Sequence, residues 1–149
     1  RWERLLQFAR ERWEQPASGL FFLAANNELP MAFVQALLAI GYRPVALSGA
    51  GEKVVDIAIQ RTLAELRRRD ADVLLVSNDG DFVEQMGDLL DGRRAGVVGF
   101  TEFRNAGFYQ LAEQGLESFD LEYDVHAFNE QLPRVRIIPI DEFDPAEFL

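Results

Sequence analysis

Four short apolar runs, each flanked by turn-forming residues, constrain the fold of this chain most strongly. They cover residues 20–24, 44–47, 73–76 and 95–99. A short continuous apolar run is typical of a strand that is buried on both faces of a parallel sheet. The chain is therefore expected to build its core around such a sheet.

Segments with helical periodicity lie before and between these runs. In the first of them Trp2, Leu5, Leu6, Ala9 and Trp13 form a single apolar stripe. Later helices are predicted over residues 31–40, 55–69, 82–90 and 108–116. Strands that alternate with helices favour parallel pairing through right-handed crossovers. Residues 1–140 are thus predicted to form a three-layer α/β/α, Rossmann-like domain with a mainly parallel sheet.

The C-terminal part is predicted to contain weaker elements. Residues 119–123 suggest an edge strand, and residues 135–140 are strand-like as far as Pro139. Residues 141–149 alternate acids with aromatic residues and are interpreted as an acidic tail. The tail is either a solvated terminus or a segment that docks on a protein partner or on a second copy in a homodimer.

Composition excludes several classes of site. The chain has 149 residues, of which 48% are apolar, and this is enough for one domain with a buried core. It has no cysteine, so disulfides, thiolate zinc sites and a cysteine nucleophile are excluded. No apolar run is long enough for a membrane helix and no secretory signal opens the chain. We therefore expect a cytoplasmic protein without a membrane partner.

The formal net charge of −10 is unevenly distributed. Residues 1–110 have a net charge of −2 and contain basic groups at residues 67–69 and 93–94, whereas residues 111–149 have a net charge of −8. An acidic chain argues against a nucleic-acid partner. Because the acidity belongs mainly to the C-terminal part, the nearly neutral remainder is compatible with RNA binding.

Asp79 and Asp81 follow the predicted strand at residues 73–76. Ligands of parallel α/β sheets collect at the carboxyl ends of the strands. Gly80 separates the two acids, and we expect its conformational freedom to let both carboxylates point to one place. Clustered carboxylates repel one another, and a hard cation such as Mg²⁺ or Mn²⁺ relieves the repulsion.

Each acid of this pair also has a purely structural interpretation. Asp81 followed by Glu84 resembles a capping box, and Asp79 suits an ordinary turn. Asp56, in the first turn of its predicted helix, could reach the same rim of the sheet or could simply complement the helix dipole. Lone acids are well explained by these alternatives, but two carboxylates together at a strand end are not.

Three segments of the sequence resemble the NYN domains, a branch of the PIN-like ribonucleases. The segments are Lys53-Val-Val-Asp56, Ser77-Asn-Asp-Gly-Asp-Phe82 and Arg94-Ala-Gly-Val-Val-Gly99, and the similarity extends over residues 20–99. The resemblance implies a Rossmann-like fold whose acids bind Mg²⁺ or Mn²⁺ and hydrolyse RNA. It assigns catalysis and metal binding to Asp56, Asp79 and Asp81.

The same resemblance implies residues that contact the substrate, namely Ser77, Asn78, Lys53 and Arg61. The sequence departs from the family pattern in three places. Asn78 stands where the family has Gly, and we expect Asn to tolerate the left-handed conformation there. Val54 replaces the Gly that usually follows Lys53. The family's first strand, which ends in an Asp, is expected upstream of Arg1.

The sequence thus predicts a metal-dependent endoribonuclease that acts on single-stranded or structured RNA. The alternative is a catalytically silent NYN-like module that binds RNA or protein. The only histidine, His126, has no second histidine or thiol at ligand spacing, so a packing or surface role is favoured over metal binding.

Overall fold

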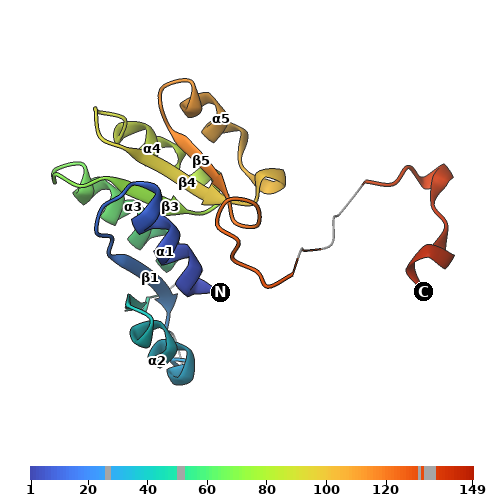
Figure 1. Ribbon diagram of the computed structural model, residues 1–149, viewed down its shortest axis with the longest axis horizontal. Helices are drawn as coiled ribbons and strands as arrows, with labels where there is room; N and C mark the ends of the chain where they lie inside the picture. Colours follow the sequence, from blue (N-terminus) through green and yellow to red (C-terminus); the bar gives the residue numbers. More distant parts are fainter. Residues whose placement is uncertain (26–27, 50–52, 131, 133–136) are drawn as a thin grey trace.

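The computed structural model describes residues 1–25, 28–49, 53–130, 132 and 137–149 (Figure 1). Its helices are α1 (Trp2–Arg12), α2 (Met31–Ala39), α3 (Val54–Leu66), α4 (Val83–Asp88) and α5 (Ala106–Ala112). Its strands are β1 (Gly19–Ala24), β2 (Tyr42–Leu47), β3 (Val73–Val76), β4 (Ala95–Gly99) and β5 (Glu117–Asp120). Short 3₁₀ turns are η1 (Gly80–Phe82), η2 (Thr101–Phe103), η3 (Ile140–Glu142) and η4 (Pro145–Phe148). The alternation of helix and strand expected from the sequence is confirmed.

The strands form two parallel groups. β1 pairs with β2, and β3, β4 and β5 form a second group in that order. Within the described residues β1 and β3 each pair on one side only. The chain therefore forms a three-layer α/β/α, Rossmann-like fold with parallel strands, as predicted, but its strands are divided into two hydrogen-bonded groups.

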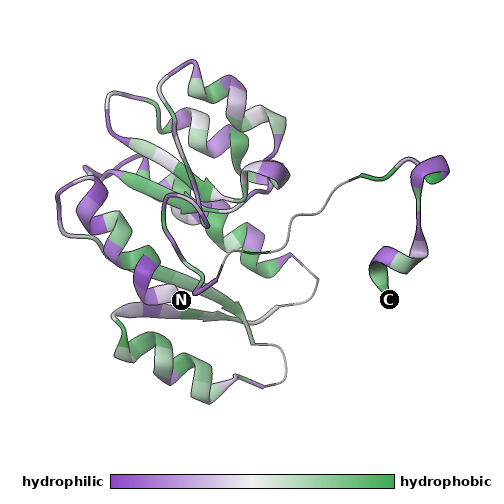
Figure 2. Cartoon of the chain, turned by 45° about the vertical axis from the view of Figure 1, so that its right-hand side comes forward, coloured by the Kyte–Doolittle hydropathy of each residue, from purple (hydrophilic) through white to green (hydrophobic). Residues whose placement is uncertain are grey.

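Neighbouring residues of β4 show which helices cover which face. Val97 is fully buried in a cluster with residues of α3, α4 and α5, among them Leu63, Met86 and Phe108. Val98, next in the strand, is fully buried in a different cluster with Leu5 of α1. Because successive side chains of a strand point to opposite faces, α1 covers one face and α3, α4 and α5 cover the other. Figure 2 shows the hydrophobic strands running between these helices.

Two helices join the two groups of strands. Leu5 of α1 packs in the cluster that contains β4 and β5, whereas Leu6 packs with Leu37 of α2 and Tyr42 of β2. On the opposite face, α3 contacts β1, and its Leu63 packs in the core cluster of β3 and β4. α1 and α3 therefore hold both groups in one layer, although β1 and β3 exchange no ladder hydrogen bonds.

The C-terminal part differs from its prediction in detail. The expected edge strand lies at β5, two residues earlier than predicted, and it pairs parallel to β4. Of the predicted strand at residues 135–140, residues 135–136 lie outside the described part and residues 137–139 form no strand. The acidic tail contains the turns η3 and η4 and lies apart from the α/β body in Figure 1. Its Phe143 and Phe148 rings contact each other, with centroids 5.7 Å apart.

Helix length and hydropathy give one further fact. None of the helices in the described part of the chain combines the length and the apolar character needed to cross a bilayer.

Candidate metal centre

The turn after β3 positions Asp79 through its own hydrogen bonds. The last ladder bond of the strand runs from the Ser77 amide to the Val98 carbonyl, which places the turn at the carboxyl edge of the sheet. The Asp79 amide then donates to the Ser77 hydroxyl at 3.0 Å. One Asp79 carboxylate oxygen accepts from the Asp81 amide at 2.9 Å and so caps η1. This fixes the direction of the Asp79 side chain.

The capping box considered for Asp81 is not formed, and Asp79 caps η1 instead. No side chain caps α4, which follows η1 directly, and Asp81 occupies the interior of η1 instead. This cap on η1 uses the Oδ1 atom of Asp79. Structural and ligand roles are therefore compatible in Asp79, and Asp81 has no capping role.

Asp56 lies in the first turn of α3 and reaches the same place. One carboxylate oxygen from each of Asp56, Asp79 and Asp81 can be chosen so that all three lie within 4.8 Å of one another. Asp56 is half-buried and the other two acids are exposed. The structure thus brings together the three carboxylates that the sequence singled out, from two elements that are far apart in the chain.

Two further residues of the α3 region hold Asp81. The Lys53 ammonium lies 3.3 Å from the Asp81 carboxylate, but its side chain is 70% exposed, so the pair is weak. The Gln60 amide donates to the Asp81 carbonyl at 3.0 Å. Gln60 lies one helical turn after Asp56, so one face of α3 supplies both a carboxylate and a support for the turn. Sequence reasoning missed Gln60, although its four-residue spacing from Asp56 was visible.

Gly80 is required for a different reason from the one expected. Its φ is not positive, so the turn makes no use of the left-handed conformation. A Cβ at Gly80 would instead overlap the Asn105 side-chain amide nitrogen. The Asn105 side-chain oxygen caps α5 by accepting from the Gly107 amide at 2.8 Å. The Asn105 backbone amide donates to the Asn78 carbonyl at 3.1 Å. Asn105 therefore packs against the turn between the two acids.

Asn78 also differs from its prediction. Its φ is not positive, so the left-handed conformation expected from its place in the family pattern is absent. Its side-chain oxygen is buried without a hydrogen-bond partner among the described residues. That oxygen lies against Gly99, where any Cβ would overlap it. The Asn78 side-chain oxygen is thus packed against the end of β4, while the residue as a whole is half-buried.

The remaining predicted contacts are placed as follows. Ser77 supports Asp79 through its hydroxyl. Arg61 is exposed on α3, and its side chain enters no hydrogen bond or ion pair of the described residues. His126 is exposed, and its carbonyl accepts from Arg4 at 2.9 Å. The structure brings no further acid and no histidine of the described part into the carboxylate group.

The donor set has the chemistry of a site for a hard cation. Three carboxylates supply only oxygen donors, which suit Mg²⁺, Mn²⁺ or Ca²⁺ rather than a thiophilic metal. Their mutual repulsion is opposed within the described residues by one exposed ammonium, that of Lys53. Asp56, Asp79 and Asp81 could therefore hold one divalent cation at the carboxyl edge of β3.

Comparison with known proteins supports the fold alone. No family model matches the chain, and no curated protein matches it. Among solved structures, the chain is similar to the crystal structure of VPA0982, a protein of unknown function from Vibrio parahaemolyticus, with a TM-score of 0.64. The two sequences are 18% identical over 82% of this chain and 78% of that chain.

Proposed function

We propose that this chain is a metal-dependent endoribonuclease of the NYN type and acts in the cytoplasm. The observation that carries the proposal is the convergence of Asp56, Asp79 and Asp81 within 4.8 Å at the carboxyl edge of a parallel sheet. In such sheets ligands bind at the switch point, where the chain connections on either side lead in opposite directions along the sheet. Here β1 leads outward to β2, and β3 leads the other way through β4 to β5. The cluster follows β3, at this switch point.

The reaction is the hydrolysis of an RNA phosphodiester. When bound, Mg²⁺ or Mn²⁺ lowers the pKa of a coordinated water and neutralises charge on the phosphate. The three carboxylates would hold the cation. The cap on η1 orients Asp79, Gln60 holds the backbone of Asp81, and Lys53 contacts its carboxylate. Lys53, at the rim of the cluster, is free to turn toward a phosphate because its side chain is 70% exposed.

Cleavage of labelled single-stranded and hairpin RNA with Mn²⁺ or Mg²⁺ tests the proposal. Asp79→Asn should lower the cleavage rate by at least about 100-fold, because losing a ligand costs more than losing a residue that only orients one. Asp70→Asn, an exposed acid ahead of the opposite end of β3, should cleave like the unmodified chain. Equal rates for the two variants would overturn the proposed site.

The silent binding module is the second candidate, and the size of the carboxylate group favours it. Within the described residues the group has three acids, two of them exposed, and this is fewer than the four that the family pattern implies. Calorimetry with Mn²⁺ separates the two candidates. Mn²⁺ binding that Asp79→Asn weakens by about 10-fold or more, without cleavage by either protein, would assign the silent module.

A further inference from the structure

One face of α3 carries a row of exposed cations that begins at the carboxylate cluster. Lys53 precedes the helix, Arg61 lies within it and Arg68 follows its end. With 3.6 residues per turn, these positions fall within about 80° of the helix circumference, and the row is about 22 Å long. Ile57, between the first two cations, is also exposed. The row is thus a continuous strip of surface.

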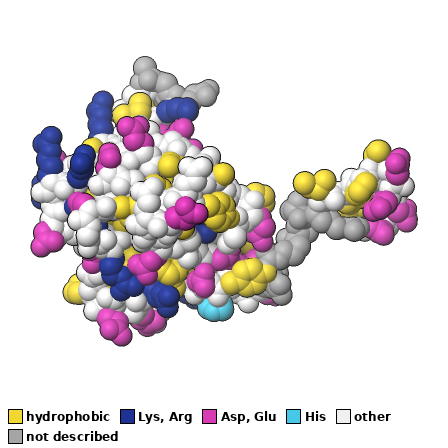
Figure 3. All heavy atoms as spheres, turned by 90° about the horizontal axis from the view of Figure 1, so that it is seen from above, with side chains coloured by type: hydrophobic (Ala, Val, Ile, Leu, Met, Phe, Trp, Pro, Cys, Tyr) yellow, Lys and Arg dark blue, Asp and Glu magenta, His cyan; other side chains and the backbone are white. Residues whose placement is uncertain are grey.

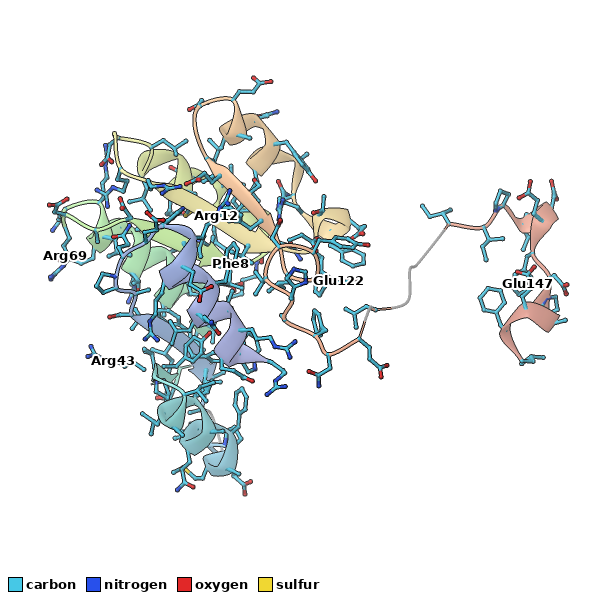
Figure 4. All side chains as sticks on the ribbon, viewed as in Figure 1. Phe8, Arg12, Arg43, Arg69, Glu122 and Glu147 are labelled. Carbon is cyan, nitrogen blue, oxygen red and sulfur yellow. The ribbon has the colours of Figure 1, made fainter. Side chains whose placement is uncertain are left out.

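The side chains of this row have few partners within the chain. The Arg61 and Arg68 side chains enter no hydrogen bond or ion pair of the described residues, and Lys53 has only its exposed contact with Asp81. Figure 3 shows Lys and Arg side chains gathered toward one end of the body, away from the acidic and apolar C-terminal segment. Figure 4 shows Arg69, just beyond the row, directed away from the body.

A groove between α3 and α4 lies at the far end of the row. Its volume is about 240 Å³, and it is lined by Leu63, Ala64, Arg67, Arg68, Gln85 and Asp88. α3 begins beside the carboxylate cluster and α4 begins just after η1, so both helices lead from the cluster toward the groove. The groove combines an apolar floor with two cations, an amide and a carboxylate.

Gln85 gives an independent indication that the groove takes a ligand. Its side-chain oxygen is buried and has no hydrogen-bond partner among the described residues. A buried acceptor without a donor costs free energy, so a native protein rarely keeps one without a reason. Gln85 lines the groove, and a turn of its side chain would let its oxygen accept from a ligand with N–H groups at its edge. Asp88 beside it is a second acceptor.

We propose that the α3 face and the α3–α4 groove form a tract for single-stranded RNA that leads away from the carboxylate cluster. Lys53, Arg61 and Arg68 contact successive stretches of the phosphate backbone, and a nucleobase enters the groove and donates to Gln85. At a rise of about 3.4 Å per stacked nucleotide, the row matches about six nucleotides. The inference rests on the proposed function for its substrate class, but its binding test does not depend on cleavage.

The chemistry of the tract favours a single strand over a duplex or an acidic peptide. A single row of cations on a convex helix faces one backbone, whereas a duplex presents two. An unstacked base of a single strand can turn its hydrogen-bonding edge into a pocket. An acidic peptide would pair with the arginines, but its carboxylates would be repelled by Asp88 and would leave Gln85 without a donor.

Fluorescence anisotropy with the full chain and labelled oligouridylate in EDTA, where cleavage is prevented, tests the tract. Arg61→Ala and Arg68→Ala should each weaken binding about 5-fold at 0.1 M salt and lower the salt slope by about 0.7, the share of one contact to a single strand. Arg10→Ala is the matched control, because Arg10 is exposed on α1, on the opposite face of the sheet. Gln85→Leu should weaken binding without lowering the Tm, which a purely structural role would not predict.

The outcomes separate this inference from the proposed function. Binding that depends on Arg61, Arg68 and Gln85 supports the tract even when Asp79→Asn and the unmodified chain show no cleavage. Equal affinity of Arg61→Ala, Arg68→Ala and Arg10→Ala would overturn the tract, and so would no detectable binding by the unmodified chain. Equal affinity for a duplex, or full competition by polyglutamate, would overturn the single-stranded assignment.

Discussion

The two edges of the sheet are both rich in charged residues, yet they differ in how those charges are used. At the amino edge, where β3 and β4 begin, the charged side chains of Arg93, Arg94 and Asp72 are bound to other parts of the chain. At the carboxyl edge three carboxylates converge and face one exposed ammonium in the described structure. The comparison shows that charge alone does not identify a functional site.

Arg93 and Arg94 show how the amino edge uses its charges. Arg93 donates to the carbonyls of Leu66, Arg67 and Ala71, at the end of α3 and the start of β3, and pairs with Asp91. The hydrogen bonds that Arg93 donates to the Asp91 carboxylate raise the pKa of Arg93. Arg94 pairs with Glu117 at 2.8 Å and lies over the Trp13 ring. The basic group at residues 93–94 therefore has partners within the chain.

Arg93→Ala is expected to have the largest effect on stability, and it tests the difference between the two edges. It removes three bonds to carbonyls and an ion pair from a side chain that is only 11% exposed. The free energy of unfolding should fall by about 3 kcal/mol. Urea denaturation at constant m-value measures the change, with Arg43→Ala, an exposed residue of β2, as a control within about 0.5 kcal/mol. If metal-free Asp79→Asn is destabilised as much as Arg93→Ala, the two edges do not differ in this way.

A smaller effect is expected at the carboxyl edge from Gly80→Ala. The added methyl overlaps Asn105, so stability should fall by about 2 kcal/mol and Mn²⁺ affinity by about 10-fold as the turn shifts. Calorimetry and urea denaturation measure both. Gly87→Ala is the matched control, because a Cβ there meets Leu111 at an ordinary 3.4 Å.

Combining Gly80→Ala with Asn105→Ser sharpens the test. Serine keeps the cap of α5 but removes the amide group that the new methyl would overlap. The double variant should therefore recover part of the loss in Mn²⁺ affinity. Strictly additive losses would mean that Asn105 does not constrain the turn.

The smallest effect concerns Tyr42, which begins β2 at the amino edge. Burial raises the pKa of its hydroxyl to about 12, and the hydroxyl donates to the Trp2 carbonyl at 2.7 Å. Between about pH 10 and 12 the unfolded chain loses this proton while the folded chain keeps it, so stability should fall as the pH rises. Tyrosinate absorbance should show one of the three tyrosines titrating near 12.

Tyr42→Phe should cost about 1 kcal/mol near neutral pH and remove this part of the alkaline loss. A normal titration of all three tyrosines would contradict the burial of the hydroxyl.

The fold was predictable because it depends on periodicity. The runs at residues 20–24, 44–47, 73–76 and 95–99 lie within or close to the observed strands, and their alternation with helices led correctly to parallel pairing. Asp79 and Asp81 were equally visible, since they follow a buried strand directly. Asp56 was predictable as a neighbour because parallel strands end at one edge, so the helix after β2 begins beside the turn after β3.

What the sequence by itself determined is therefore the set of elements, their parallel arrangement and the three acids at one edge. Only the tertiary structure decided which charges are bound and which are free. It also decided that Gly80 is required because Asn105, distant in sequence, packs against it. Gly99 is required because Asn78, which follows the neighbouring strand β3, packs against it. The physical reason is that close packing and hydrogen-bond partners depend on which segments meet in space, and local patterns of residues do not contain that information.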